Sequence, residues 1–92
     1  MNSPPIKLKI HADVARRIRQ HARSSMKAEI CGVMIGRHHD NTTIVEDCIR
    51  GEHSDQGGAH VTFTQDTWEH IYQIKDRDFP DKKIIGWYHS HP

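Results

Sequence analysis

The sequence lacks several features that mark other classes of protein. No stretch approaches the run of about 20 apolar residues that a membrane helix needs, and the first ten or so residues lack the apolar segment of a secretory signal. Lys and Arg total 13 against 12 Asp and Glu, a formal net charge of +1, and the charges are scattered. These absences exclude a membrane-spanning protein, argue against a nucleic-acid partner, and predict a cytoplasmic location.

Cysteine is also scarce. Cys31 and Cys48 are far apart and form no C-x-x-C unit, so in a reducing cytosol they are most simply buried small apolar side chains. A zinc-dependent nucleotide deaminase would need an H-x-E or C-x-E unit and a P-C-x-x-C pair, and neither occurs. The sequence therefore disfavours a deaminase.

The 92 residues, 35% of them hydrophobic and 27% charged, are typical of one small domain over residues 1–92. Apolar and basic residues alternate over residues 6–10, which predicts a strand with one buried face. Apolar residues recur every four positions over 12–26 and predict an amphipathic helix. The next predicted elements are a hairpin of strands over 29–36 and 42–49 and a helix that Thr64 caps and Phe79 ends.

A final strand begins at Lys83, and its unbroken apolar run is typical of a central strand covered on both faces. Alternating helices and strands without an internal repeat indicate the α/β class, with a mixed sheet and helices packed on it. Four aromatic residues are assigned to packing in the core: Trp68, Tyr72, Trp87 and Tyr88.

Histidine is abundant, with nine residues, and two of them close the last predicted strand. His89 and His91 project from the same face of that strand, roughly 6.5–7 Å apart at their bases, so both imidazoles can reach one ion. Catalytic zinc sites usually have three protein ligands, so these two need a third. The alternative is a pair of hydrogen-bonded strand-end histidines without a metal.

Glu29 stands at the entrance of an apolar strand, where a carboxylate is costly to bury unless it faces water, a cation or a donor. Beside a zinc-bound water it can act as general base in peptide hydrolysis. The alternative is a solvated carboxylate or a salt bridge to Lys27. The other seven histidines lack paired spacing and are assigned to surface or packing positions: His11, His21, His38, His39, His53, His60 and His70.

Two segments together resemble the JAMM/MPN+ (Mov34/MPN/PAD-like) zinc metalloprotease family, compact prokaryotic type: A-E-I-C-G-V-M-I-G at 28–36 and G-W-Y-H-S-H-P at 86–92. The resemblance covers nearly the whole chain and implies a cytidine-deaminase-like JAMM/MPN fold with a curved mixed sheet. It implies that Glu29 is the general acid/base and that His89 and His91 bind Zn²⁺. It also implies a metallopeptidase or isopeptidase that cleaves a protein or peptide substrate, such as the C-terminus of a ubiquitin-like or sulfur-carrier protein.

The family pattern continues after the second histidine with a seven-residue spacer, a serine, two residues and an aspartate that completes the metal site. Of that spacer only Pro92 is present, so the resemblance predicts a C-terminally truncated, inactive chain that covers the N-terminal two-thirds of the domain. The competing hypothesis is a non-catalytic MPN-type scaffold for protein interactions. Such members generally lack the glutamate and histidines retained here, which favours the enzyme.

Overall fold

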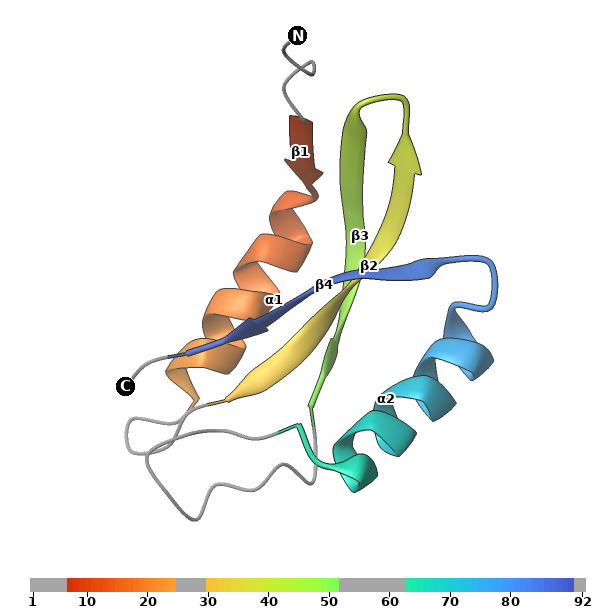
Figure 1. Cartoon of the computed structure of the whole chain (residues 1–92). Coiled ribbons are helices and arrows are strands. Elements are labelled where there is room, and N and C mark those ends of the chain that lie inside the picture. The colour runs from red at the N-terminus through yellow and green to blue at the C-terminus, as the bar shows by residue number, and fades with distance from the viewer. Residues whose placement is uncertain (1–6, 25–29, 52–62, 91–92) are drawn as a thin grey trace, which may run out of the picture.

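The computed structural model describes residues 7–24, 30–51 and 63–90. The described elements are four strands and two helices (Figure 1). They are β1 (Lys7–Ile10), α1 (Ala12–Arg23), β2 (Cys31–His39), β3 (Thr42–Arg50), α2 (Gln65–Asp78) and β4 (Lys83–His89). The α/β class predicted from the sequence is confirmed.

The four strands form one mixed sheet in the order β1-β3-β2-β4. β1 pairs with β3 in parallel, whereas β3 with β2 and β2 with β4 pair antiparallel. Figure 1 shows β2 and β3 as one long hairpin that β4 crosses near its middle. The predicted hairpin is confirmed, but β2 continues through His39 and leaves only Asp40 and Asn41 for the turn.

The two helices cover opposite faces of the sheet. On one face, Ile71 of α2 packs with the buried side chains of Val33, Ile35 and Ile49. On the other, α1 reaches Tyr88, whose ring lies against the backbone of Gly32, the residue before Val33. Successive strand residues point to opposite faces, so these contacts separate the two helices. Each fully buried isoleucine stabilises the fold by about 1.5–3 kcal/mol.

The second helix begins as its sequence predicts. Thr64 caps it, because the Thr64 hydroxyl oxygen accepts a hydrogen bond from the backbone N–H of Thr67 at 3.1 Å. Asp66 in the first turn favours the positive end of the helix dipole. The helix ends at Asp78, before Phe79 and Pro80.

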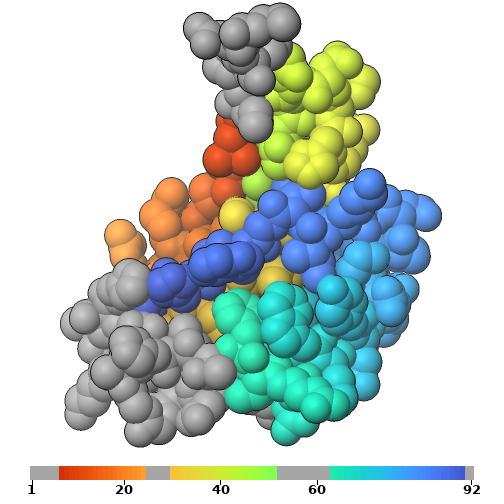
Figure 2. Space-filling model, in the orientation of Figure 1, coloured from red at the N-terminus to blue at the C-terminus, as the bar shows by residue number. Residues whose placement is uncertain are grey.

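Two expectations about strand burial are wrong. β1 has no buried face, and Leu8 is 66% exposed, because β1 pairs along one edge only and no described helix lies over it. β4 lies at an edge of the described sheet, not at its centre. In Figure 2 β4 lies at the surface between α1 and α2. A continuous apolar run does not distinguish a central strand from one that the described residues leave at an edge.

The assignment of four aromatic residues to the core is half right. Trp68 and Tyr88 are half-buried, and Trp68 packs against the core around Ile71. Tyr72 is 50% exposed and Trp87 is 61% exposed, so neither is a core residue. Neither described helix is both long and apolar enough to cross a membrane.

Candidate metal centre at the paired ends of β2 and β4

Strand pairing brings the two sequence motifs together. Cys31 is the register partner of His89, and Gly32 is the partner of Tyr88. Beyond the last pair, the backbone N–H of Ser90 donates to the carbonyl oxygen of Ile30 at 3.0 Å. The N–H of Ile30 in turn donates to the Ser90 hydroxyl oxygen at 3.0 Å. Residues 60 positions apart are therefore hydrogen-bonded in both directions.

The three site residues predicted from the sequence are placed unequally. His89 is the last residue of β4, and its side chain is exposed. Glu29 and His91 lie outside the described residues. Their described sequence neighbours are Ile30 and Ser90, which form the reciprocal pair. The structure therefore joins the two chain segments that carry the predicted site.

Trp87 lies beside His89 on the same face of β4. The indole and imidazole rings are stacked, with centroids 5.7 Å apart and planes at 18°. Such a parallel contact restricts rotation of the imidazole about its side-chain bonds. The exposed indole therefore helps to orient the ring of His89 instead of filling the core.

Tyr88 faces the other way, toward α1. Its hydroxyl is hydrogen-bonded to Nδ1 of His21 at 2.9 Å, and the two rings meet edge to face with centroids 5.8 Å apart. A Cβ at position 32 would overlap the phenol ring, so the glycine there makes room for Tyr88. Burial raises the pKa of the Tyr88 hydroxyl well above its ordinary value, which keeps the phenol neutral.

The sequence-based assignment of His21 to a surface or packing position missed this hydrogen bond. The sequence did indicate that His21 is buried. It follows Val14 by seven residues and Ile18 by three, and so continues the apolar stripe of the helix. The structure buries both Val14 and His21. A histidine on an apolar stripe needs a polar partner, and the chain supplies Tyr88.

Both cysteines are among the described residues, and neither forms a disulfide. Cys31 is fully buried next to the candidate centre, as the sequence predicts for a small apolar side chain. Cys48 is half-buried, and burial raises the pKa of its thiol. The glycine at position 51 leaves the space that the Cys31 sulfur occupies.

The described residues alone do not assemble a metal site. Within 7–24, 30–51 and 63–90, no three His, Cys, Asp or Glu side chains lie close enough to hold an ion. This part of the chain offers His89, an exposed imidazole at a strand end, and imidazole nitrogen is a preferred zinc donor. The chemistry of this donor is compatible with zinc, and a zinc site would need further ligands from outside these residues.

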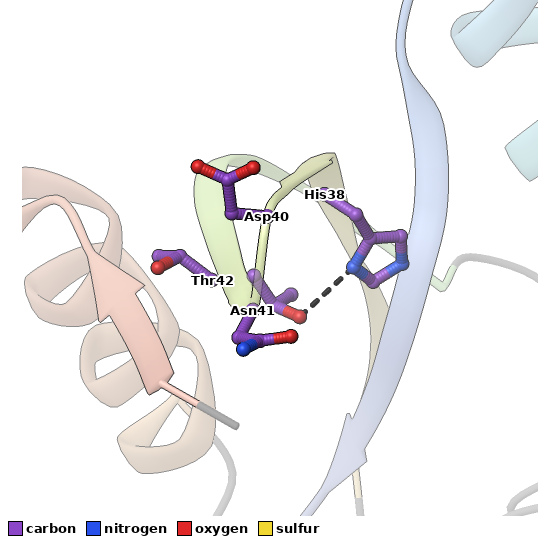
Figure 3. Close-up of a pocket in the computed structure, with 5 residues that line it drawn as sticks. His38, Asp40, Asn41 and Thr42 are labelled. Atoms are coloured by element: carbon purple, nitrogen blue, oxygen red, sulfur yellow. Dashed lines mark hydrogen bonds between the residues drawn. The ribbon is translucent and has the colours of Figure 1, made fainter. Parts of the chain in front are cut away.

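An open hollow of about 250 Å³ lies at the far tip of the hairpin and is lined by His38, Asp40, Asn41, Thr42 and Thr43 (Figure 3). Nδ1 of His38 is hydrogen-bonded to the Thr43 hydroxyl at 2.9 Å, and both side chains come from residues around one turn. The hollow is remote from His89, because His89 pairs with Cys31 at the start of β2 and the tip follows the end of β2.

Comparison with known proteins identifies the family. Residues 4–92 match the family described as JAB1/Mov34/MPN/PAD-1 ubiquitin protease. The chain belongs to this family. The JAMM/MPN resemblance in the two motifs is thereby confirmed, and so is the fold that it implied.

Named relatives support the same family. COP9 signalosome complex subunit 5 of Dictyostelium discoideum is 32% identical over 89 residues, which are 92% of this chain and 26% of the relative. Ubiquitin carboxyl-terminal hydrolase RPN11 of Saccharomyces cerevisiae is 28% identical over 78 residues, which are 79% of this chain and 24% of the relative. The chain thus spans about a quarter of the length of these curated relatives.

A solved structure shares the fold. The solution structure of protein DSY2949 from Desulfitobacterium hafniense superposes with a TM-score of 0.72 at 26% sequence identity. The match covers 92% of this chain and 57% of the bacterial chain. The fold of this chain is therefore shared with a solved bacterial structure.

Proposed function

We propose that this chain carries the glutamate and two histidines of a zinc-dependent JAMM-type peptidase or isopeptidase. The observation that carries the proposal is the reciprocal pair of hydrogen bonds between Ile30 and Ser90. Consecutive Cα atoms are about 3.8 Å apart, so the covalent chain keeps Glu29 and His91 each within one residue of this pair. His89 is the other neighbour of Ser90.

In this proposal His89 and His91 hold the zinc ion, and an aspartate supplied from outside the 92 residues completes the site. Bound zinc would lower the pKa of a water molecule toward about 7 and polarise the carbonyl of the bond to be cleaved. Glu29 takes a proton from the attacking water and returns it to the leaving amine. Ser90 holds the ends of the two motif strands together through Ile30.

The substrate is a protein or peptide, and the family description and the name of the yeast relative favour the C-terminal tail of a ubiquitin-like protein. A cytoplasmic location is supported by two cysteines that form no disulfide. We take residues 1–92 to be part of a single domain of this fold. The 92 residues by themselves are expected to be inactive.

The decisive experiment compares Glu29→Gln with the unaltered protein, in the longest natural form that contains this chain. Zinc content is measured by atomic absorption, and turnover is measured on a ubiquitin-like substrate with a C-terminal extension. Loss of the general base should lower kcat by about 10²–10⁴-fold with zinc retained.

The matched control is Glu69→Gln, which alters an exposed carboxylate of α2 that accepts a hydrogen bond from Gln65 one turn earlier, and it should leave kcat unchanged. Zinc binding without turnover that depends on Glu29 would contradict the proposal. That result would favour a non-catalytic scaffold of the same fold.

A further inference from the structure

His21 is the only histidine buried among the described residues, with 7% of its residue surface exposed. It lies in the last turn of α1, far in sequence from the strand that it contacts. Burying an imidazole is costly unless it is hydrogen-bonded, whereas an apolar side chain of similar volume would fill the same space without that cost. A hydrogen bond also fixes the relative orientation of the two side chains, which an apolar pair of similar volume would not do.

The partner of His21 is placed between the two residues of β4 that shape the candidate centre. Tyr88 lies between Trp87 and His89, and its side chain points to the opposite face of the sheet. The ring crosses position 32, which only a glycine leaves open, and the hydroxyl then meets His21 on α1. One side chain thus ties the helix, β2 and β4 together.

This contact lies close to the end of β4. A one-residue slip of a strand turns every side chain to the other face, and small displacements at a catalytic site cost activity. The helix contact acts on Tyr88, directly before His89 and two residues before Ser90. It therefore restrains register and twist at the strand end where the proposed zinc ligands lie.

We propose that His21 is a positioning residue whose hydrogen bond to Tyr88, packed over Gly32, holds the end of β4 and thereby orients His89. The role in zinc binding rests on the proposed function. The mechanical role does not, because it concerns the metal-free chain.

The first readout is amide hydrogen exchange in metal-free protein. The Ser90 N–H, which donates to Ile30, reports the end of β4, and the N–H of Ile71 in α2 reports global opening. Tyr88→Phe keeps the ring and removes only the hydroxyl. We expect exchange at Ser90 about fivefold to tenfold faster in Tyr88→Phe and His21→Leu, the effect of one lost buried hydrogen bond. Exchange at Ile71 should change much less.

Two further variants sharpen this readout. His21→Asn places an amide group near the position of Nδ1 and should exchange at Ser90 more slowly than His21→Leu. His38→Leu is the matched control, because it removes another histidine–hydroxyl bond of 2.9 Å, exposed at the hairpin tip. His38→Leu should leave the exchange rate at Ser90 unchanged. Equal acceleration at Ser90 and Ile71, or none at Ser90 in Tyr88→Phe, would overturn the proposal.

The second readout is zinc affinity, measured by competition with a chromophoric chelator. Groups that orient metal ligands typically contribute about tenfold or more, so Tyr88→Phe should bind zinc about tenfold more weakly and His38→Leu as tightly as the parent. An unchanged affinity in Tyr88→Phe would overturn the zinc part of the inference. If the parent binds no zinc, or His89→Ala binds it equally well, the proposed function fails, and the exchange experiment still decides the role of His21.

Discussion

The two ends of β2 both carry histidine nearby, but they are built differently. At one end, Cys31 and Gly32 pair with His89 and Tyr88 of a distant strand, and a buried histidine of α1 adds a third element. At the other end, His38 and His39 precede a two-residue turn, and their side chains interact with Thr43 and Asp40, which are close in sequence. The first end joins side chains from three elements, whereas the second end meets a distant segment only through the backbone pairing of β1 with β3 among the described residues.

This difference shows why histidine content does not identify a metal centre. The hairpin tip has the higher local density of histidine and a hollow, yet its side chains are exposed and far from the second motif. The paired ends of β2 and β4 carry one described histidine that faces solvent, His89, but they bring together the two sequence motifs at 28–36 and 86–92. Convergence of distant segments, more than composition, indicates a functional site.

Removal of one histidine from each end tests the comparison most strongly. His89→Ala should weaken zinc binding by about 100-fold or more, since it removes a ligand, whereas His38→Ala should leave the affinity unchanged. Both are measured by chelator competition in the longest natural form of the protein. Equal losses in the two variants would place the metal elsewhere.

A methyl group added at Gly32 tests how tightly the paired ends are packed. Gly32→Ala forces the new Cβ into the ring of Tyr88 and should destabilise the protein by about 1–3 kcal/mol in urea unfolding. Gly86→Ala is the control on β4, because its Cβ would meet only the flexible end of Met34 at 2.7 Å. Its effect should stay below about 1 kcal/mol. Similar effects at both positions would mean that Tyr88 does not need the space at Gly32.

Substitutions in the turn at the other end of β2 should change the stability of the protein without changing its zinc affinity. Asp40 has a φ of 53°, in the left-handed region that a β-branched residue avoids. Asp40→Val should therefore cost about 1 kcal/mol in unfolding free energy, and Asp40→Gly should not. Zinc affinity should be the same in both variants. A change in affinity would show that the two ends of β2 are coupled.

The smallest effect is expected from the exposed bond at the hairpin tip. Thr43→Val removes the hydroxyl that bonds His38 and should change stability by no more than about 0.5 kcal/mol. The buried bond between His21 and Tyr88 has the same length of 2.9 Å. If Thr43→Val proves as costly as Tyr88→Phe, burial is not what distinguishes the two ends.

Much of the fold follows from local patterns. The spacing of Val14 and Ile18 predicted α1, the Thr64 cap predicted the start of α2, and the turn chemistry around Asp40 predicted the hairpin. Burial was predicted less well. Leu8 and Trp87 are exposed although their sequence patterns indicated packing, because periodicity reports which residues share a face and not what covers that face.

The sequence by itself determined the family and the types of the elements, since each depends on residues close along the chain or on motif letters. Only the tertiary structure decided that Ile30 meets Ser90, that Gly32 admits Tyr88 and that His21 is its partner. These contacts join residues from three elements. Their register depends on how the whole chain buries its apolar surface, which no local window of sequence contains.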